Sequence, residues 1–124
     1  MIQKIKTNMA PAAIGPYSQA VMDENYIFLS GQIPIDPATG EVVEADITVQ
    51  AEQVISNIKG VLAEAGVSIE NTMKTGCFLA DMKDFQDFNA VYAKHFTSNP
   101  ARSCVAVKSL PKNVLCEIEV IVKK

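Results

Sequence analysis

The sequence of 124 residues has no tryptophan, one histidine and only three cysteines. Cys77, Cys104 and Cys116 share no spacing typical of metal ligands, and His95 is the only imidazole, so no zinc or other metal site is expected. An odd number of cysteines also makes a poor disulfide framework. Free thiols in a reducing cytoplasm are the expected state.

Long apolar runs and blocks of like charge are missing as well. No segment approaches the roughly 18 apolar residues that span a bilayer, and residues 1–6 lack the apolar stretch of a secretory signal. The formal net charge is −3, without the basic footprint that nucleic-acid binding usually leaves. We therefore expect a cytoplasmic protein that binds neither membranes nor nucleic acid.

The composition is that of an ordinary soluble globular protein. Apolar residues make up 48% of the chain and charged residues 20%. A chain of this length holds one hydrophobic core, so residues 1–124 are expected to form a single domain. No Walker loop, Rossmann glycine pattern, metalloprotease helix or nucleophile elbow is present.

The N-terminal third has the short apolar runs and turn residues of strands. Strands are predicted at 2–6, 18–22 and 26–30, the last two joined as a hairpin. Residues 31–40 contain two prolines that remove ladder donors, so this stretch is predicted as a shaped loop with a tight turn at 36–40.

At Ile47 the apolar period changes to three- and four-residue steps, which predicts an amphipathic helix that Asp46 caps and Gly66 ends. Gly60 inside this helix costs about 1 kcal/mol relative to alanine, so close packing against the sheet is expected there. A second amphipathic helix has an apolar side made of Phe85, Phe88, Val91, Tyr92 and Phe96.

Further strands are predicted at 73–80, 103–107 and 114–122, which completes an α+β fold with two helices on one face of a sheet. The last strand has two unequal faces. One face is apolar, and the other carries Leu115, Glu117, Glu119 and Ile121. Two helices cover only one face, so the mixed face meets water or another subunit. Its composition favours self-association into a ring, with a cleft between subunits as the natural site.

Arg102, at the start of the 103–107 strand, is either a solvated surface residue or a carboxylate-binding group. Alternation places Arg102 and Cys104 together. Because Ser103, Val105 and Val107 form a mainly apolar opposite face, we expect Arg102 on the helix-free face with Glu117. A planar guanidinium there can hold a substrate carboxylate through two parallel hydrogen bonds.

The sequence pattern leaves three interpretations of Glu117 open. It is an exposed strand carboxylate, a structural partner of Arg102, or a group that positions water and moves protons. Crowding by Glu119, two residues away, would raise one pKa of the pair. Cys104 is a weaker candidate for a nucleophile, since no Cys-His arrangement is recognisable.

Motifs spread over nearly the whole chain resemble the reactive intermediate deaminase (RidA) family. They include residues 10–20 (APAAIGPYSQA), 30–34 (SGQIP), 78–82 (FLADM), 100–105 (PARSCV) and 110–112 (LPK). The resemblance implies a chorismate-mutase-like α+β fold with a mixed, mostly antiparallel sheet. It also implies a homotrimer with three clefts at the subunit interfaces.

The resemblance further implies a cofactor-free hydrolase that limits metabolite damage. It would convert 2-aminoacrylate- and 2-aminocrotonate-type enamines and their imines (2-iminopropanoate, 2-iminobutanoate) to 2-oxo acids and ammonia. Arg102 would bind the substrate carboxylate, and Glu117 would orient the hydrolytic water. The pocket would be lined by Tyr17, Ser30, Gly31, Asn89 and the backbone near Cys104.

The sequence departs from the family pattern at two positions, and two other functions remain as alternatives. Gly76 and Cys77 stand where many members have threonine followed by an aliphatic residue, which puts the pocket shape in question. The first rival is a non-catalytic sensor of small carboxylates or 2-oxo acids that uses the same clefts. The second comprises the endoribonuclease and chaperone-like activities attributed to relatives, and the acidic balance argues against strong RNA binding.

Overall fold

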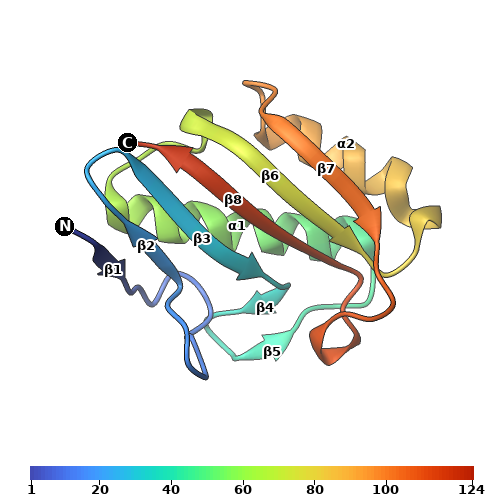
Figure 1. The fold of residues 1–124 in the computed structure, drawn as a ribbon. Helices are drawn as coiled ribbons and strands as arrows, with labels where there is room; N and C mark the ends of the chain where they lie inside the picture. The colour runs from blue at the N-terminus through green and yellow to red at the C-terminus, as the bar shows by residue number, and fades with distance from the viewer.

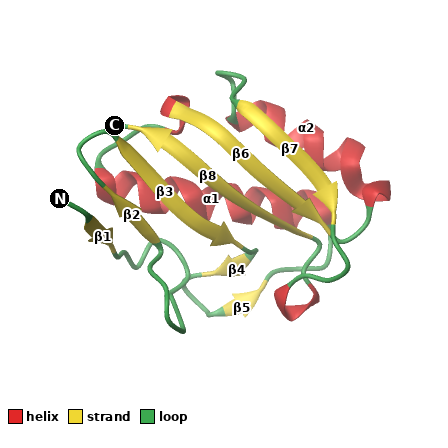
Figure 2. Cartoon of the chain, in the orientation of Figure 1, coloured by secondary structure: helices red, strands yellow, loops and turns green.

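The computed structural model describes all 124 residues and has a six-stranded sheet with two helices on one face (Figure 1). The strand order is β1-β2-β3-β8-β6-β7. Neighbouring strands are antiparallel except β6 and β7, which run parallel. Figure 2 shows both helices behind the same side of the sheet. The predicted α+β class and mixed, mostly antiparallel sheet are therefore confirmed.

The strands of the main sheet lie where the sequence predicts them, with ends shifted by a few residues. They are β1 (Gln3–Ile5), β2 (Ala20–Met22), β3 (Tyr26–Gln32), β6 (Thr72–Leu79), β7 (Ala101–Ala106) and β8 (Cys116–Lys123). Short 3₁₀ turns at Ile69–Asn71, Met82–Asp84 and Pro111–Asn113 connect the later elements.

The segment predicted as a loop is more regular than expected. Gly31 and Gln32 belong to the end of β3, and β4 (Ile35–Asp36) pairs with β5 (Glu41–Val42) in a two-stranded sheet. The tight turn is present, because the N–H of Gly40 donates to the carbonyl of Asp36 at 2.8 Å with Gly40 at φ 75°. Pro34 precedes this hairpin and Pro37 lies in its turn, so neither proline removes a donor from the two short strands.

Helix α1 (Ile47–Ala65) begins and ends at the predicted signals. The Asp46 side chain accepts a hydrogen bond from the N–H of Thr48 at 3.1 Å. Gly66 adopts the left-handed conformation, with φ 72°, and its N–H donates to the carbonyl of Ala63. Both ends thus satisfy backbone groups that a helix leaves without internal partners.

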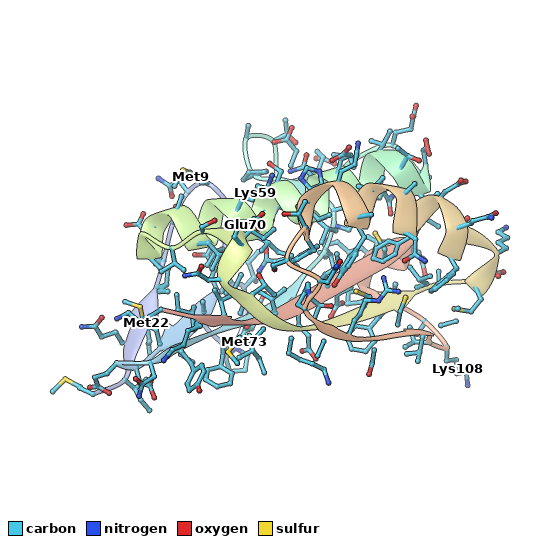
Figure 3. The ribbon with its side chains drawn as sticks, turned by 90° about the horizontal axis from the view of Figure 1, so that it is seen from above. Met9, Met22, Lys59, Glu70, Met73 and Lys108 are labelled. Atoms are coloured by element: carbon cyan, nitrogen blue, oxygen red, sulfur yellow. The ribbon has the colours of Figure 1, made fainter.

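Gly60 packs closely against a neighbour, but that neighbour is the N-terminal loop and not the sheet. A Cβ at Gly60 would lie 2.3 Å from the carbonyl oxygen of Met9. Met9 is seen beside α1 in Figure 3. Buried Gln19 holds the loop in place, accepting from the N–H of Thr7 at 2.7 Å and donating to the carbonyl of Pro11 at 2.7 Å.

Helix α2 (Phe85–His95) packs beside α1 on the same face of the sheet. Phe88, Val91 and Tyr92 on its inner side are buried, as is Phe96 just beyond its end. At the outer side, Nε2 of His95 lies 2.6 Å from Oε1 of Glu52 on α1. None of the helices has the length and apolar character needed to cross a membrane.

The two faces of the sheet differ as the alternation of β8 predicts. Cys116, Ile118, Val120 and Val122 are buried beneath the helices. On the other side, Glu117 and Ile121 are half-buried and Glu119 is exposed. Figure 3 shows this uncovered side, with Met73, opposite the helices and Lys59. We call it the open face.

Candidate functional site

The register of the last strands fixes the side on which Arg102 lies. Arg102 is paired with Thr75 of β6, which is itself paired with Val120 of β8. Directly paired residues point to the same face of a sheet. Because Thr75 and Val120 are buried under the helices, Arg102 lies on the helix-covered face.

Glu117 lies on the opposite side. It is paired with Phe78 of β6, which is paired with Val105 of β7, and Val105 is exposed on the open face. The expectation that Arg102 shares the helix-free face with Glu117 is therefore wrong. The apolar character of Val105 suggested a core side, but the open face also carries apolar side chains, Phe28 among them.

Helix α2 supplies the contacts that hold Arg102. Its Nη1 donates a hydrogen bond of 2.7 Å to Oδ1 of Asn89. The guanidinium carbon lies 4.7 Å from the ring centroid of Tyr92 and 5.7 Å from that of Phe85. A cation over aromatic faces is attracted by their electron-rich centres. Arg102 is thus a half-buried, oriented group and not a freely solvated one.

A cavity of about 410 Å³ opens beside the guanidinium. It is lined by Asn89, Tyr92, Ala93, Phe96, Asn99, Pro100 and Arg102. Its one cationic lining group faces an otherwise neutral wall of aromatic rings, a small side chain and two amides. A cavity of this kind suits a small anion with an apolar part.

Cys104 follows Arg102 on the same face and is paired with Cys77 of β6. Burial raises the pKa of the Cys77 thiol to about 12. Burial also raises the pKa of Cys104, although the charge of Arg102 acts in the opposite direction. A thiol that keeps its proton at neutral pH is a poor nucleophile, so the environment argues against that role for Cys104.

Glu117 rests on the backbone of Gly31. A Cβ at Gly31 would fall 2.2 Å from Oε2 of Glu117, so only glycine leaves room for the carboxylate. Gly31 lies in an irregular stretch of β3 between Leu29 and Gln32, where the register with β8 shifts. Burial raises the pKa of Glu117, and the negative charge of Glu119 raises it further.

Tyr17 and Ser30 lie in the same region as Gly31. Tyr17 is 54% exposed, and together with Gly31 it lines a cavity of about 330 Å³. The hydroxyl of Ser30 donates to the carbonyl of Ser18 at 2.6 Å, which ties the Tyr17 loop to β3. These contacts place a tyrosine ring, a glycine backbone and a carboxylate at one end of the sheet.

The predicted site residues, joined by Tyr92, therefore fall into two groups within the chain. We call Arg102, Asn89, Tyr92 and Cys104 the arginine half-site. We call Glu117, Gly31, Ser30 and Tyr17 the glutamate half-site. The structure brings the residues together within each half-site, but it places Arg102 and Glu117 on opposite faces. No three histidine, cysteine, aspartate or glutamate side chains are arranged so that they could hold a metal ion.

Tyr92 and Phe85 both lie next to Arg102. Their sequence pattern predicted only that they belong to the apolar side of the second helix. A signal was present in their spacing. Phe85 lies four residues before Asn89, and Tyr92 lies three residues after it. Those intervals put both rings on the helix side that carries Asn89, and hence beside anything that Asn89 binds.

The fold and the half-sites together define an α+β protein that holds an oriented arginine on one side of its sheet and a half-buried glutamate on the other. Residues 7–124 match the family described as endoribonuclease L-PSP. A RutC family protein of Pyrococcus horikoshii is 51% identical, covering 100% of this chain and 99% of that one.

Solved structures agree with this match. A protein of the conserved Rid family from Yersinia pestis is 44% identical, with a TM-score of 0.97 and full coverage of both chains. TdcF of E. coli, solved with bound serine, is 42% identical, with a TM-score of 0.94 and 98% coverage of each chain. The chain belongs to the endoribonuclease L-PSP family, which includes the RutC and Rid proteins, and the resemblance to RidA is confirmed.

Proposed function

We propose that this protein hydrolyses amino-acid-derived enamines and their imines, the 2-aminoacrylate and 2-aminocrotonate type, to 2-oxo acids and ammonia. The observation that carries the proposal is the arginine half-site. An arginine oriented by Asn89 and Tyr92 beside a small cavity is suited to a substrate carboxylate. Membership of a family that includes the Rid proteins supports the same activity.

The proposal includes a chorismate-mutase-like homotrimer whose active sites lie between subunits. Its support is the separation of Arg102 and Glu117 in one protomer, since catalysis by both needs a second copy. Strand β7 is at the edge of the sheet, so Arg102 sits at the rim of the protomer, within reach of a neighbour. Phe28 and Val105, 47% and 48% exposed on the open face, provide apolar surface for such contact.

In the proposed reaction Arg102 binds the substrate carboxylate and fixes the C=N carbon next to a water molecule. Asn89 uses one N–H of the guanidinium and leaves others for the carboxylate. Glu117 from the neighbouring subunit holds the water and accepts its proton as the oxygen bonds to carbon. The imine nitrogen takes up one proton as the carbinolamine forms, so that water has added across the C=N bond. The amino group then takes a second proton, passed on by Glu117, the hydroxyl loses its proton, and the C–N bond breaks to give a carbonyl and ammonia. Orientation of this kind supplies several kcal/mol of barrier reduction.

The raised pKa of Glu117 suits the role of proton acceptor. A carboxylate that binds its proton more tightly than an exposed one removes a proton from water more readily. Because free imines already hydrolyse quickly in water, a modest acceleration is sufficient. The proposed mechanism therefore uses only side chains of this protein.

The test couples a threonine or serine dehydratase to this protein and follows decay of the released imine. Wild type should accelerate decay, and Arg102→Ala should leave only the spontaneous rate with an unchanged circular dichroism spectrum. Arg102→Lys should rescue poorly, because lysine lacks the planar fork. Lys83→Ala, an exposed cation before α2, is the matched control and should keep full activity. A wild-type rate equal to the spontaneous rate would refute the proposal.

A second candidate is a non-catalytic sensor of small carboxylates, and the bound serine in TdcF favours it. The sensor needs Arg102 but not Glu117. Glu117→Gln should keep affinity for 2-oxobutanoate and lose turnover if the protein is an enzyme. If the variant supports every cellular function of the wild type, the sensor is favoured. The net charge of −3 gives no support to the RNA cleavage that the name of the endoribonuclease L-PSP family implies.

A further inference from the structure

Tyr92 connects the guanidinium of Arg102 to the buried sheet. The hydroxyl groups of Tyr92 and Thr75 share a hydrogen bond of 2.8 Å. Thr75 is fully buried and Tyr92 is 9% exposed, so each hydroxyl depends on the other for a partner away from water. The bond links α2 to β6 at the position directly beside Arg102.

The ring of Tyr92 is also held from its sides. Phe96 stacks on it with the centroids 4.4 Å apart and the planes 25° apart. Phe88 lies at 6.1 Å in a tilted arrangement. With one ring face occupied by Phe96, the plane of Tyr92 has little freedom. Arg102 lies over this fixed surface, 4.7 Å from the centroid.

Two contacts then restrict the guanidinium itself. The aromatic surface limits its tilt, because a flat delocalised cation stacks on a flat ring. The hydrogen bond from Nη1 to Oδ1 of Asn89 limits its rotation within that plane. Asn89 uses one of the five N–H groups of the guanidinium. The others are the donors left for a carboxylate.

We infer that Tyr92, fixed by Thr75, is a positioning residue that aligns the Arg102 guanidinium for recognition of a planar carboxylate next to the C=N group. The inference rests on the proposed function for its catalytic consequence. Its structural part, that Tyr92 orders Arg102, stands independently. Losing the ring gives Arg102 more conformations and weakens carboxylate binding. Losing only the hydrogen bond between the hydroxyls of Tyr92 and Thr75 leaves the ring in place but less fixed, and it weakens carboxylate binding less.

Arg102 is the only arginine in the chain, which permits a direct test. Its Nε–H group should give a single side-chain NMR signal in ¹⁵N-labelled protein. A guanidinium over an aromatic ring experiences a ring-current shift. We expect an upfield-shifted, sharp signal in the wild type, loss of that shift in Tyr92→Leu, and a smaller displacement in Thr75→Val. An identical arginine signal in wild type and Tyr92→Leu would overturn the inference.

Kinetics and binding supply the functional readout. Tyr92→Leu should raise KM and weaken 2-oxobutanoate binding by about tenfold, with kcat less affected. Tyr92→Phe and Thr75→Val should each cost about two- to fivefold. Their combination should cost no more than one alone, because both remove the same hydrogen bond. A purely structural role would instead lower the amount of folded protein and leave KM and affinity of the folded fraction unchanged, which would refute positioning.

The outcomes separate this inference from the proposed function. If wild type binds 2-oxobutanoate but hydrolyses no imine, the deaminase proposal fails, while weaker binding by Tyr92→Leu still supports positioning. If wild type hydrolyses imines and Tyr92→Leu retains the wild-type KM, positioning fails and the function stands. Should Tyr92→Leu not fold, Tyr92→Phe and Thr75→Val carry the same test. Wild-type KM, affinity and arginine signal in both would then refute it.

Discussion

The carboxylate of Glu117 lies directly against the backbone of Gly31. A Cβ at Gly31 would come within 2.2 Å of Oε2 and 2.8 Å of Cδ, far inside normal contact distance. The clashing atoms are the far end of a side chain, so a larger residue would displace the carboxylate before it disturbed the strand. Gly31 therefore sets where the proposed base sits.

Gly31→Ala should lower the deamination rate by about 10- to 100-fold, because displacement of a reacting group by about 1 Å has effects of that size. The melting temperature should change little. Gly76→Ala is the matched control, since its Cβ would lie 3.0 Å from Oε1 of Glu119 and leave Glu117 untouched. Full activity of Gly31→Ala in the coupled assay would contradict the assigned position of the base.

The pH dependence of activity should follow Glu117. Burial first, and Glu119 second, raise its pKa above the usual 4.5. A proton acceptor works when deprotonated, so kcat/KM should fall as the pH drops through this raised pKa. Glu119→Gln removes one of the two causes of the raised pKa of Glu117, so it should move the acid limb of the pH–rate profile to lower pH. Glu117 is not the base if the acid limb of the pH–rate profile lies below pH 4.5 in the wild type and stays in the same place in Glu119→Gln.

Stability should depend on pH through the same group. The folded-state pKa of Glu117 lies above its unfolded value, so the folded protein binds this proton more tightly. Ionised Glu117 therefore lowers stability at neutral pH, and this effect disappears as the pH falls through the folded pKa. Glu117→Gln should be more stable than wild type at pH 7, and the difference should shrink on acidification. Thermal melts of the two proteins between pH 7 and pH 4 measure it.

A charge on the open face should separate the subunits of the proposed trimer. Phe28 is 47% exposed there, and Phe28→Asp places a carboxylate where apolar contact is expected. Sedimentation should show a trimer for wild type and monomers for the variant, with deamination lost in the monomers. Val49→Asp on the outer side of α1 is the control and should remain trimeric and active. A monomeric, active wild type would refute the assembly.

Gly60→Ala should destabilise the protein, although glycine to alanine inside a helix usually gains about 1 kcal/mol. The added Cβ would lie 2.3 Å from the carbonyl oxygen of Met9, a backbone atom that cannot turn away. Overpacking of this kind costs about 1–3 kcal/mol. We expect a melting temperature lower by about 4–12 °C. Ser56→Ala on the exposed side of α1 should show no such loss, and an unchanged Gly60→Ala would contradict the loop packing.

Local signals predicted the elements of this fold well, because their causes are local. The bounds of α1 follow from a cap at Asp46 and a left-handed residue at Gly66, both within one turn of the helix. The burial of β8 follows from simple alternation between a core and a mixed face. The neighbour of Gly60 was not predictable in the same way, because the loop at Met9 is distant in sequence.

The face of Arg102 was mispredicted for a physical reason. Alternation shows that Arg102 and Cys104 share a side of β7, but the parallel register with β6 decides which side that is. Apolar Val105 suggested the core, whereas it lies on the open face. Under the proposed assembly the open face contacts other subunits, and the centres of such interfaces resemble protein cores in composition, so hydrophobicity alone cannot tell the two faces apart.

The division of the two half-sites between opposite surfaces of each chain has a genetic consequence. Under the proposed assembly every active site draws Arg102 from one chain and Glu117 from another. A chain without Arg102 and a chain without Glu117 are each inactive alone, yet a mixed trimer contains some clefts in which both groups are intact. Two defective alleles expressed together would then complement each other, as they could not if each chain carried a complete site.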